Sequence, residues 1–422
     1  MKTNKTKYTT ILILLIFITN FIYSQDNSTE ILNRAKLLMI DGNYVEAIKA
    51  LKSLTEIDST NVEALYILGT AYKSISDFSK SASVFNHAIK FKPNDPKILL
   101  ALGDDYFSFG MMDEAEKIGQ RAFEIDSTDN QIKLFLGRVY SAENKWENAE
   151  VIYSNLAASD SGNSYLFERL GKCKSSLGKT DAAIIDYKIA YQLNPQNLGI
   201  ILNLSYLYYL QKQIDSAISV VYTGLKYFPY SIDLVNRMGD IFFIVPNYST
   251  ASLYYLRAVS LGDSSSLTQK NIGICYYWVQ EYDSAESYLT RSISLNSSDA
   301  ISYYYLGASY KAQKRYKDAI DNFQQAAALL KNDFLSNTYI QLGASYQFYK
   351  KYQLAVEYYK DGLRENPSNT STLFFIASVY DNNLHNNNTA LYYYKRYLNE
   401  SKNPDIKMKN YAQERLNILK NK

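Results

Sequence analysis

The chain has 422 residues, of which 47% are hydrophobic and 21% charged; this composition is typical of a folded globular protein and excludes a wholly disordered chain or a bundle of membrane spans. Its 45 Lys and Arg nearly balance 42 Asp and Glu, for a formal net charge of +3. Two Cys and two His exclude a disulfide framework and leave few ligands for a metal site.

Residues 1–24 have the layout of a secretory signal peptide. Three lysines lie within the first seven residues, an apolar run follows at 11–17 and extends through 21–23, and Ser24 is a small residue at the expected cleavage point. The apolar part is shorter than the ~20 residues that span a bilayer, so we expect cleavage, with an uncleaved N-terminal anchor as the alternative. Residues 25–27 would then form a short linker.

The mature chain would carry no net charge, because the three lysines leave with the signal peptide and 42 basic and 42 acidic side chains remain. Nucleic-acid binding needs a clustered basic excess, so we expect no nucleic-acid partner. No second long apolar run follows, and we expect no membrane span after cleavage.

A period of 34 residues runs through most of the chain. Gly69, Gly103, Gly137 and Gly171 are 34 residues apart, and the series continues at Gly239, Gly273, Gly307 and Gly343, with Ser205 filling the gap. Twelve positions after each of these stands another small residue, such as Ala115 or Ala319. We expect these small residues where two helices cross, because larger side chains would hold the backbones apart.

Each period contains two stripes of apolar residues at helical spacing. In residues 300–333, one stripe contains Tyr303, Leu306 and Tyr310, and the other contains Phe323 and Leu330. This pattern predicts two short amphipathic helices in each repeat. All seven prolines fall at the expected helix junctions, where a missing N–H is tolerated.

The pattern resembles the tetratricopeptide repeat, which has Leu-Gly-x-x-Tyr in its first helix and Ala-x-x-x-Phe/Tyr in its second. The matching segments are 68–72, 102–106, 136–140, 306–310 and 342–346. The resemblance implies an all-α fold, a right-handed α-solenoid of about eleven helix-turn-helix units. The units start near residues 28, 62, 96, 130, 164, 198, 232, 266, 300, 336 and 370.

Two departures and a final helix mark the C-terminal part of the array, which spans residues 28–404. Two residues are inserted at 334–335, and the last unit has a longer polar turn at 382–388. Residues 405–422 then place Met408, Tyr411, Ala412, Leu416 and Leu419 on one face of a helix. A solenoid would otherwise expose core at its end, so we expect residues 405–422 to be a capping helix.

No set of residues converges on a catalytic pattern. Residues 171–180 superficially resemble a phosphate-binding loop, but six residues instead of four separate Gly171 from Gly178, and the segment falls in a predicted helix. Cys173 and Cys275 occupy the same repeat position, three repeats apart, where we expect small buried side chains that do not form a disulfide. We therefore expect no catalytic residue, no metal and no cofactor.

In the tetratricopeptide family the first helices line a concave groove, and partners usually bind there. At the corresponding positions, units 1–5 hold eight charges and three aromatic residues, whereas units 6–11 hold five charges and eight aromatic residues. The eight charges are Lys36, Glu63, Lys73, Lys97, Asp104, Arg138, Glu168 and Lys172. The five charges are Asp233, Asp240, Lys270, Lys311 and Asp381.

The C-terminal aromatic residues form the predicted partner-binding groove, since aromatic side chains dominate binding hot spots. They are Tyr206, Tyr209, Phe243, Tyr277, Trp278, Tyr304, Phe348 and Phe374. The alternative is that these rings pack between helices.

The expected function is a non-catalytic scaffold or adaptor that binds a protein or an extended peptide in this groove. The predicted signal peptide implies export, to a periplasm or cell envelope or to a secretory compartment and the outside. The alternative function is glycan or peptidoglycan binding that regulates an envelope enzyme, because sugars also stack on aromatic faces. The carboxylate clamp of co-chaperone family members pairs Lys at position 5 with Asn at position 9, and no unit has this pair.

Overall fold

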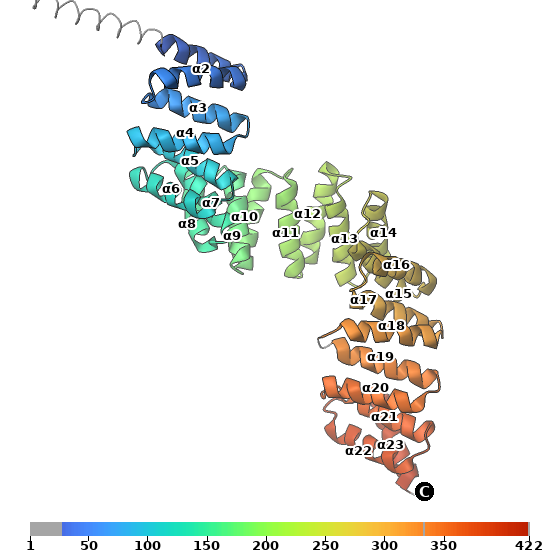
Figure 1. Ribbon diagram of the computed structural model, residues 1–422. Coiled ribbons are helices and arrows are strands. Elements are labelled where there is room, and N and C mark those ends of the chain that lie inside the picture. Colours follow the sequence, from blue (N-terminus) through green and yellow to red (C-terminus); the bar gives the residue numbers. More distant parts are fainter. Residues whose placement is uncertain (1–27, 332–333, 421–422) are drawn as a thin grey trace, which may run out of the picture. The chain divides into compact units, whose positions relative to one another are not determined.

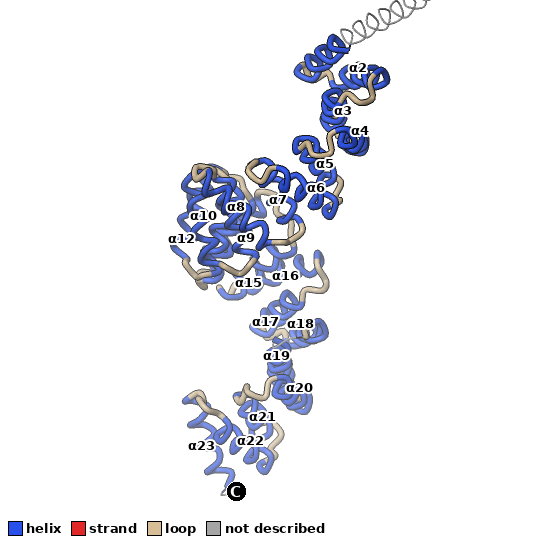
Figure 2. The backbone as a smooth tube through the Cα atoms, turned by 90° about the vertical axis from the view of Figure 1, so that its left-hand side faces the viewer, coloured by secondary structure: helices blue, strands red, loops and turns tan. Residues whose placement is uncertain are grey.

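The computed structural model describes residues 28–331 and 334–420. The predicted signal peptide 1–24 and linker 25–27 lie outside these residues. The described part is built of helices and the turns between them, with no strand (Figure 2). The prediction of an all-α helix-turn-helix solenoid is therefore confirmed.

The chain divides into two compact parts, here called the N-terminal half (Met1–Ile200) and the C-terminal half (Ile201–Lys422). The described residues of the N-terminal half begin with a helical segment at 28–40. Its further helices are α2 (Tyr44–Ile57), α3 (Val62–Ser74), α4 (Phe78–Phe91), α5 (Pro96–Ser108), α6 (Met112–Ile125), α7 (Asn130–Ala142), α8 (Trp146–Ser159), α9 (Ser164–Ser176) and α10 (Thr180–Leu193).

The boundary between the halves falls within α11 (Leu198–Leu210). The remaining helices are α12 (Ile214–Tyr227), α13 (Ile232–Ile244), α14 (Tyr248–Ser260), α15 (Ser266–Trp278), α16 (Tyr282–Leu295), α17 (Ala300–Ala312), α18 (Tyr316–Leu329), α19 (Phe334–Phe348), α20 (Tyr352–Glu365), α21 (Ser371–Asn382), α22 (Asn387–Glu400) and α23 (Ile406–Lys420).

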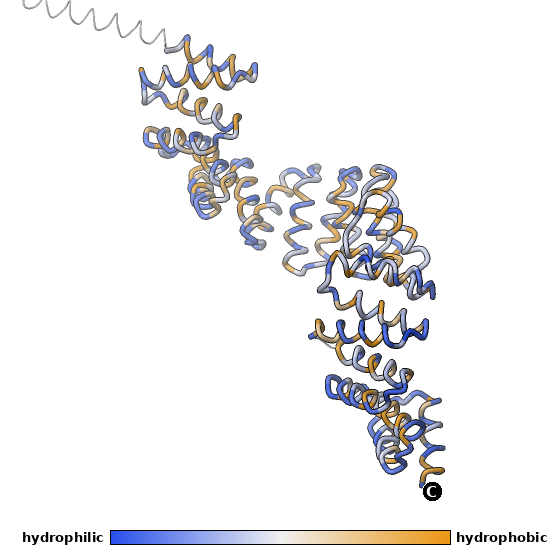
Figure 3. Tube along the Cα trace, turned by 45° about the vertical axis from the view of Figure 1, so that its right-hand side comes forward, coloured by the Kyte–Doolittle hydropathy of each residue, from blue (hydrophilic) through white to orange (hydrophobic). Residues whose placement is uncertain are grey.

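Consecutive helices pack against each other from α2 to α10 in the N-terminal half and from α12 to α23 in the C-terminal half (Figure 1). Hydrophobic and hydrophilic residues alternate along each helix at short intervals (Figure 3). This alternation is what a two-helix repeat requires, because each helix buries one stripe against its neighbours and leaves the other in solvent.

The small residue of the first helix lies against a large ring of the second, as predicted. A Cβ added to Gly239 would come within 2.6 Å of the Tyr255 ring, and one added to Gly171 within 2.6 Å of the Tyr187 ring. Tyr187 and Tyr255 are almost fully buried. The recurrent tyrosine in the second helix therefore fills the space that the missing side chain of the glycine leaves.

The turn between the two helices of a repeat contains a residue in the left-handed region. Gly178 has φ +73° and lies two residues after the end of α9, where the Lys179 N–H donates to the Lys174 carbonyl over 2.8 Å. The segment that resembles a phosphate-binding loop is thus a helix end. In other repeats the same position holds Lys212, Gln280 or Lys314, each with φ between +56° and +67°.

The C-terminal end follows the prediction with one addition. The residues inserted at 334–335 lengthen the start of a first helix, since α19 has 15 residues where α17 has 13. The capping helix α23 buries Ala412, Leu416 and Leu419 in a cluster with Tyr394 and Tyr397. A core of aromatic and aliphatic side chains therefore closes this end of the array.

Candidate functional site

The eight predicted groove residues all lie on first helices in the C-terminal half, a surface here called the first-helix face. Tyr206 and Tyr209 are on α11, Phe243 on α13, Tyr277 and Trp278 on α15, Tyr304 on α17, Phe348 on α19 and Phe374 on α21. Successive first helices are two elements apart in the chain. Some of them also contact each other directly, namely α15 with α17 and α17 with α19.

Neighbouring rings connect three of these first helices. Phe243 packs edge-on against Tyr248, with 5.5 Å between ring centroids, and Tyr248 stacks on Trp278 at 5.6 Å. From Trp278 the contacts continue through Tyr277 (5.4 Å) to Tyr305 (5.3 Å). Tyr305 in turn lies 5.4 Å from Tyr304. The structure thus brings Phe243, Tyr277, Trp278 and Tyr304 into one aromatic cluster.

Three of the predicted residues have large exposed rings. The exposed fractions are 50% for Trp278, 59% for Phe348 and 43% for Tyr206. Trp278 lies nearly parallel to Tyr248 (11° between planes), and Phe348 nearly parallel to Tyr316 at 5.3 Å (12°). The Trp278 and Phe348 rings are therefore each held in place by a second, less exposed ring.

Other predicted residues pack inside the repeats. Tyr304 is half-buried between Phe323 (5.4 Å) and Phe334 (4.6 Å), and burial raises the pKa of its hydroxyl to about 12. Phe374 lies in the terminal cluster, against Tyr397 and Tyr411 of the last two helices. Phe374 is thus separated from the other predicted groove residues. Some predicted residues are therefore exposed, such as Trp278, whereas Tyr304 and Phe374 pack between helices, which is the alternative that the sequence left open.

Polar residues surround Tyr206 in a hollow of about 390 Å³ between α11 and α13. Leu202, Asn203 and Tyr206 line it from α11, and Asp233, Asn236, Arg237 and Asp240 line it from α13. The Arg237 guanidinium carbon lies 5.0 Å from the Tyr206 ring centroid. Burial raises the pKa of the Asp240 carboxyl, which accepts a hydrogen bond from the Tyr255 hydroxyl over 2.8 Å.

On the N-terminal half, charges at the predicted groove positions pair between repeats. Lys73 Nζ lies 3.2 Å from Asp104 Oδ2, and Arg138 Nη1 lies 3.3 Å from Asp104 Oδ1. Lys36 Nζ and Glu63 Oε1 are 2.7 Å apart. These charges therefore have partners within the chain itself.

One charge predicted to face the groove lies elsewhere. Asp381 is buried beneath the capping helix, where both of its oxygens accept hydrogen bonds from Arg415 over 2.7 Å. The expectation that Asp381 lines the groove was wrong, because α23 covers this position in the last repeat.

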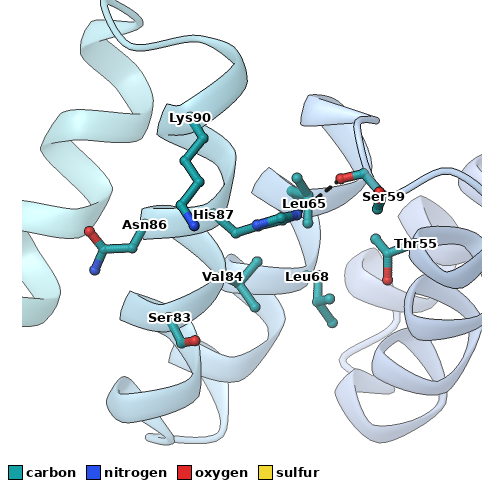
Figure 4. Close-up of a pocket in the computed structure, with 9 residues that line it drawn as sticks. All are labelled: Thr55, Ser59, Leu65, Leu68, Ser83, Val84, Asn86, His87 and Lys90. Carbon is teal, nitrogen blue, oxygen red and sulfur yellow. Dashed lines mark hydrogen bonds between the residues drawn. The ribbon is translucent and has the colours of Figure 1, made fainter.

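A second hollow, of about 560 Å³, lies between α2, α3 and α4 and includes His87 (Figure 4). The imidazole Nε2 lies 3.2 Å from the Ser59 carbonyl oxygen, and the other lining residues are Thr55, Leu65, Leu68, Ser83, Val84, Asn86 and Lys90. A histidine bonded to a backbone carbonyl between aliphatic side chains has an ordinary structural role.

The thiols lie where the sequence predicts. Cys173 and Cys275 are both free and buried, and burial raises their pKa values to about 11 and about 12. Both are therefore protonated at neutral pH and weakly nucleophilic. Among residues 28–331 and 334–420, no group of three or more His, Cys, Asp or Glu is placed to hold a metal ion. No helix in this part of the chain is long and apolar enough to cross a membrane.

Several residues of this surface were missed from the sequence. Tyr248 and Tyr316 are the first residues of second helices and are not among the predicted groove residues, yet they support the exposed Trp278 and Phe348. The relevant signal is the pairing of an aromatic residue at the start of one second helix with another at the end of the next first helix. Arg237 and Asn236 gave no signal, because single polar residues on an amphipathic helix are common.

The sequence profile described as tetratricopeptide repeat matches residues 263–332 and 298–364, and a second profile of the same description matches residues 62–95 and 165–197. No curated protein matches the chain.

Solved structures with a similar arrangement of helices include the Cut9–Hcn1 hetero-tetramer of APC/C, with 14% identity, 91% of this chain and 95% of that chain covered, and a TM-score of 0.46. A tetratricopeptide repeat protein from Parabacteroides merdae ATCC 43184 has 16% identity over 59% of this chain and 98% of that chain, with a TM-score of 0.45. Yeast Tom70 has 12% identity over 93% and 96%, with a TM-score of 0.40. On the profile matches and the helix-turn-helix repeats together, this chain is a tetratricopeptide-repeat protein.

Proposed function

We propose that the chain is a non-catalytic scaffold that binds a protein or an extended peptide on the first-helix face of its C-terminal half. The observation that carries the proposal is the presence of exposed rings, Trp278 and Phe348, that are stacked on inner rings. Such rings lose little side-chain entropy when a partner covers them, and they supply large contact area.

The contrast between the two halves supports this placement. On the N-terminal half, Lys73, Asp104 and Arg138 neutralise one another, so a partner gains little by displacing these contacts. On the C-terminal half, half-exposed aromatic surface stays in contact with water, and covering it is favourable.

A scaffold is favoured over an enzyme by the state of the reactive groups. The two thiols are buried and protonated, and His87 is bonded to a carbonyl oxygen. The proposal therefore assigns no residue a catalytic role.

We also propose that the protein is exported and acts in a periplasm or cell envelope or is secreted. The support is the arrangement of residues 1–24, with three lysines, an apolar run and a small residue at the junction. Mass spectrometry of the N-terminus of the protein purified from its native host tests this proposal. A mature chain that starts at Gln25 supports cleavage, and retained residues 1–24 support the anchor instead.

Binding on the first-helix face is tested by immobilising the mature chain and measuring the retention of a random peptide library. Replacement of both exposed rings, Trp278→Ala with Phe348→Ala, should weaken retention at least tenfold. The matched control is Tyr222→Ala with Tyr392→Ala, which removes rings of 57% and 55% exposure from the second helices α12 and α22. Retention that survives in the folded Trp278/Phe348 variant would show that this face is not the binding site.

The same proteins applied to a glycan array separate the alternative function. Saturable sugar binding that is lost in the Trp278/Phe348 variant, together with no retention of peptides, would replace the scaffold by a glycan-binding module. Peptide retention without sugar binding supports the scaffold.

A further inference from the structure

The first-helix face of the C-terminal half carries the carboxylate of Asp240. Its counterpart in the N-terminal half, Asp104, is held by two cations. Asp104 lies between Lys73 at 3.2 Å and Arg138 at 3.3 Å. Arg138 also lies over the Phe107 ring, with its guanidinium carbon 4.8 Å from the centroid. A guanidinium between a carboxylate and an aromatic face is a favourable position for a cation.

Four 34-residue repeats further along the chain, half of this arrangement is present. Asp240 stands at the position of Asp104, and Phe243 at the position of Phe107. The cations are replaced, however, since Tyr209 stands in place of Lys73 and the buried Ile274 in place of Arg138. The acceptor groups for a cation are therefore present on the C-terminal half without the two side chains that neutralise them.

The contacts of Asp240 leave one oxygen weakly compensated. Its Oδ1 accepts a hydrogen bond from the Tyr255 hydroxyl over 2.8 Å, whereas Oδ2 has its nearest cation, Arg237 Nη1, at 3.7 Å. The guanidinium of Arg237 lies over Tyr206 instead. The exposed carboxylate of Asp233 has no ion-pair partner among the described residues, so two carboxylates and one guanidinium line the hollow.

We propose that this hollow binds a basic side chain, arginine or lysine, of a peptide segment of the protein partner. Because the hollow lies between α11 and α13, the incoming cation would approach Asp240 from the side on which Lys73 contacts Asp104 in the N-terminal half, with Asp233 at the rim. The hollow of about 390 Å³ has room for such a side chain, and the aromatic cluster that begins at Phe243 would contact the residues that follow it. The inference rests on the proposed function and names the chemistry of the partner.

The test uses the full mature chain and four peptide libraries, each with seven residues and a fixed central residue: Arg, Lys, Gln or Glu. Retention of the Arg and Lys libraries should exceed that of the Gln library at least fivefold at low salt, with Glu retained least. The preference should decrease as salt is raised, because it is electrostatic.

Three variants locate the preference. Asp240→Asn should abolish it, and Asn still has an oxygen that can accept the Tyr255 hydrogen bond. Asp104→Asn is the matched control, and it should leave the preference unchanged because Asp104 already has its cations. Tyr209→Lys, which restores the residue type found at Lys73, should also abolish the preference by supplying a cation from the chain itself.

The outcomes separate this inference from the proposed function. Equal retention of all four libraries overturns the basic-residue site and leaves the scaffold intact. A preference for Arg and Lys that persists in folded Asp240→Asn also overturns the site. No retention of any library overturns the site and the scaffold together. Circular dichroism of each variant establishes that it is folded.

Discussion

At the residue scale, the least expected side chain is Asp105 on α5. It occupies the position that holds Ala71, Val139 or Cys173 in neighbouring repeats and is fully buried. Neither of its oxygens has a hydrogen-bond partner within the described part of the chain, and the nearest cation, Lys73 Nζ, is 4.0 Å from Oδ1. Burial raises the pKa of Asp105, and the neighbouring Ser81 hydroxyl and Lys73 ammonium only partly oppose this effect.

The sign of the resulting pH dependence follows from linkage. Because the carboxyl pKa is higher in the folded chain than in the unfolded one, the folded state binds the proton more tightly. Ionisation of Asp105 therefore destabilises the fold progressively as the pH rises from the unfolded value of about 4 through the raised folded value. The penalty is therefore larger at pH 7 than at pH 4.

Replacement of Asp105 by valine, the residue at the same position in the next repeat, should stabilise the protein at pH 7. We expect a gain of about 1–3 kcal/mol from removing an uncompensated buried polar group. Thermal melts at several pH values check this, and the gain should shrink between pH 7 and pH 4. A gain that does not depend on pH would show that the charge of Asp105 is not the cause. Asp321→Asn, at an exposed carboxylate on α18, should have little effect at any pH.

At the element scale, the turn inside each repeat imposes a left-handed residue irrespective of the side chain present. Gly178 adopts it without strain, whereas Gln280 (φ +67°) and Lys314 (φ +63°) place a Cβ in a conformation that disfavours it. The turns at Gln280 and Lys314 have the same hydrogen bond as the turn at Gly178. The Glu281 N–H donates to the Tyr276 carbonyl, and the Arg315 N–H donates to the Tyr310 carbonyl.

Glycine at these two positions should stabilise the array. Relief of the left-handed strain is worth about 1–2 kcal/mol, and the greater freedom of glycine in the unfolded chain offsets about 0.5–1 kcal/mol of it. We therefore expect Gln280→Gly and Lys314→Gly each to raise the midpoint of chemical denaturation modestly. Gly178→Ala is the converse change and should lower it. If all three changes lower stability, the turn conformation is not the controlling factor.

The same elements show how far the sequence predicts the fold and the site. The 34-residue period predicts the helix pairs, the crossing glycines and the buried thiols, because each depends on contacts that recur in every repeat. It does not separate Trp278, which is half exposed, from its neighbour Tyr277, which packs between Trp278 and Tyr305. The difference in exposure depends on which side chains the adjacent repeats place opposite each residue. For Trp278 the opposing side chain is Tyr248, at the start of α14, which stacks on its ring.

At the scale of the whole molecule, each helix packs mainly against its neighbours in the chain. The stability of such a protein is approximately a sum of repeat terms and nearest-neighbour interface terms. A substitution in one repeat is therefore expected to destabilise mainly that repeat and its direct neighbours. The last interface, between α22 and the capping helix α23, is the place where this property is easiest to measure, because α23 has a neighbour on one side within the described chain.

The capping helix depends on a buried ion pair as well as on its apolar face. Arg415 donates to both oxygens of Asp381 over 2.7 Å, and the Asp381 side chain is 2% exposed. Replacement of Arg415 by alanine would leave this carboxylate buried without its cation, a loss of about 3–5 kcal/mol. Because the interface is local, we expect the loss to appear as opening of α21, α22 and α23.

Hydrogen–deuterium exchange followed by mass spectrometry checks this expectation for Arg415→Ala. Faster exchange should be confined to residues 371–420, with peptides from α2 to α10 unchanged. The double variant Asp381→Leu with Arg415→Leu removes both charges and should exchange more slowly than Arg415→Ala in the same segment, because no carboxylate is left unpaired. Faster exchange throughout both halves would mean that the array unfolds as one cooperative unit, against the nearest-neighbour description.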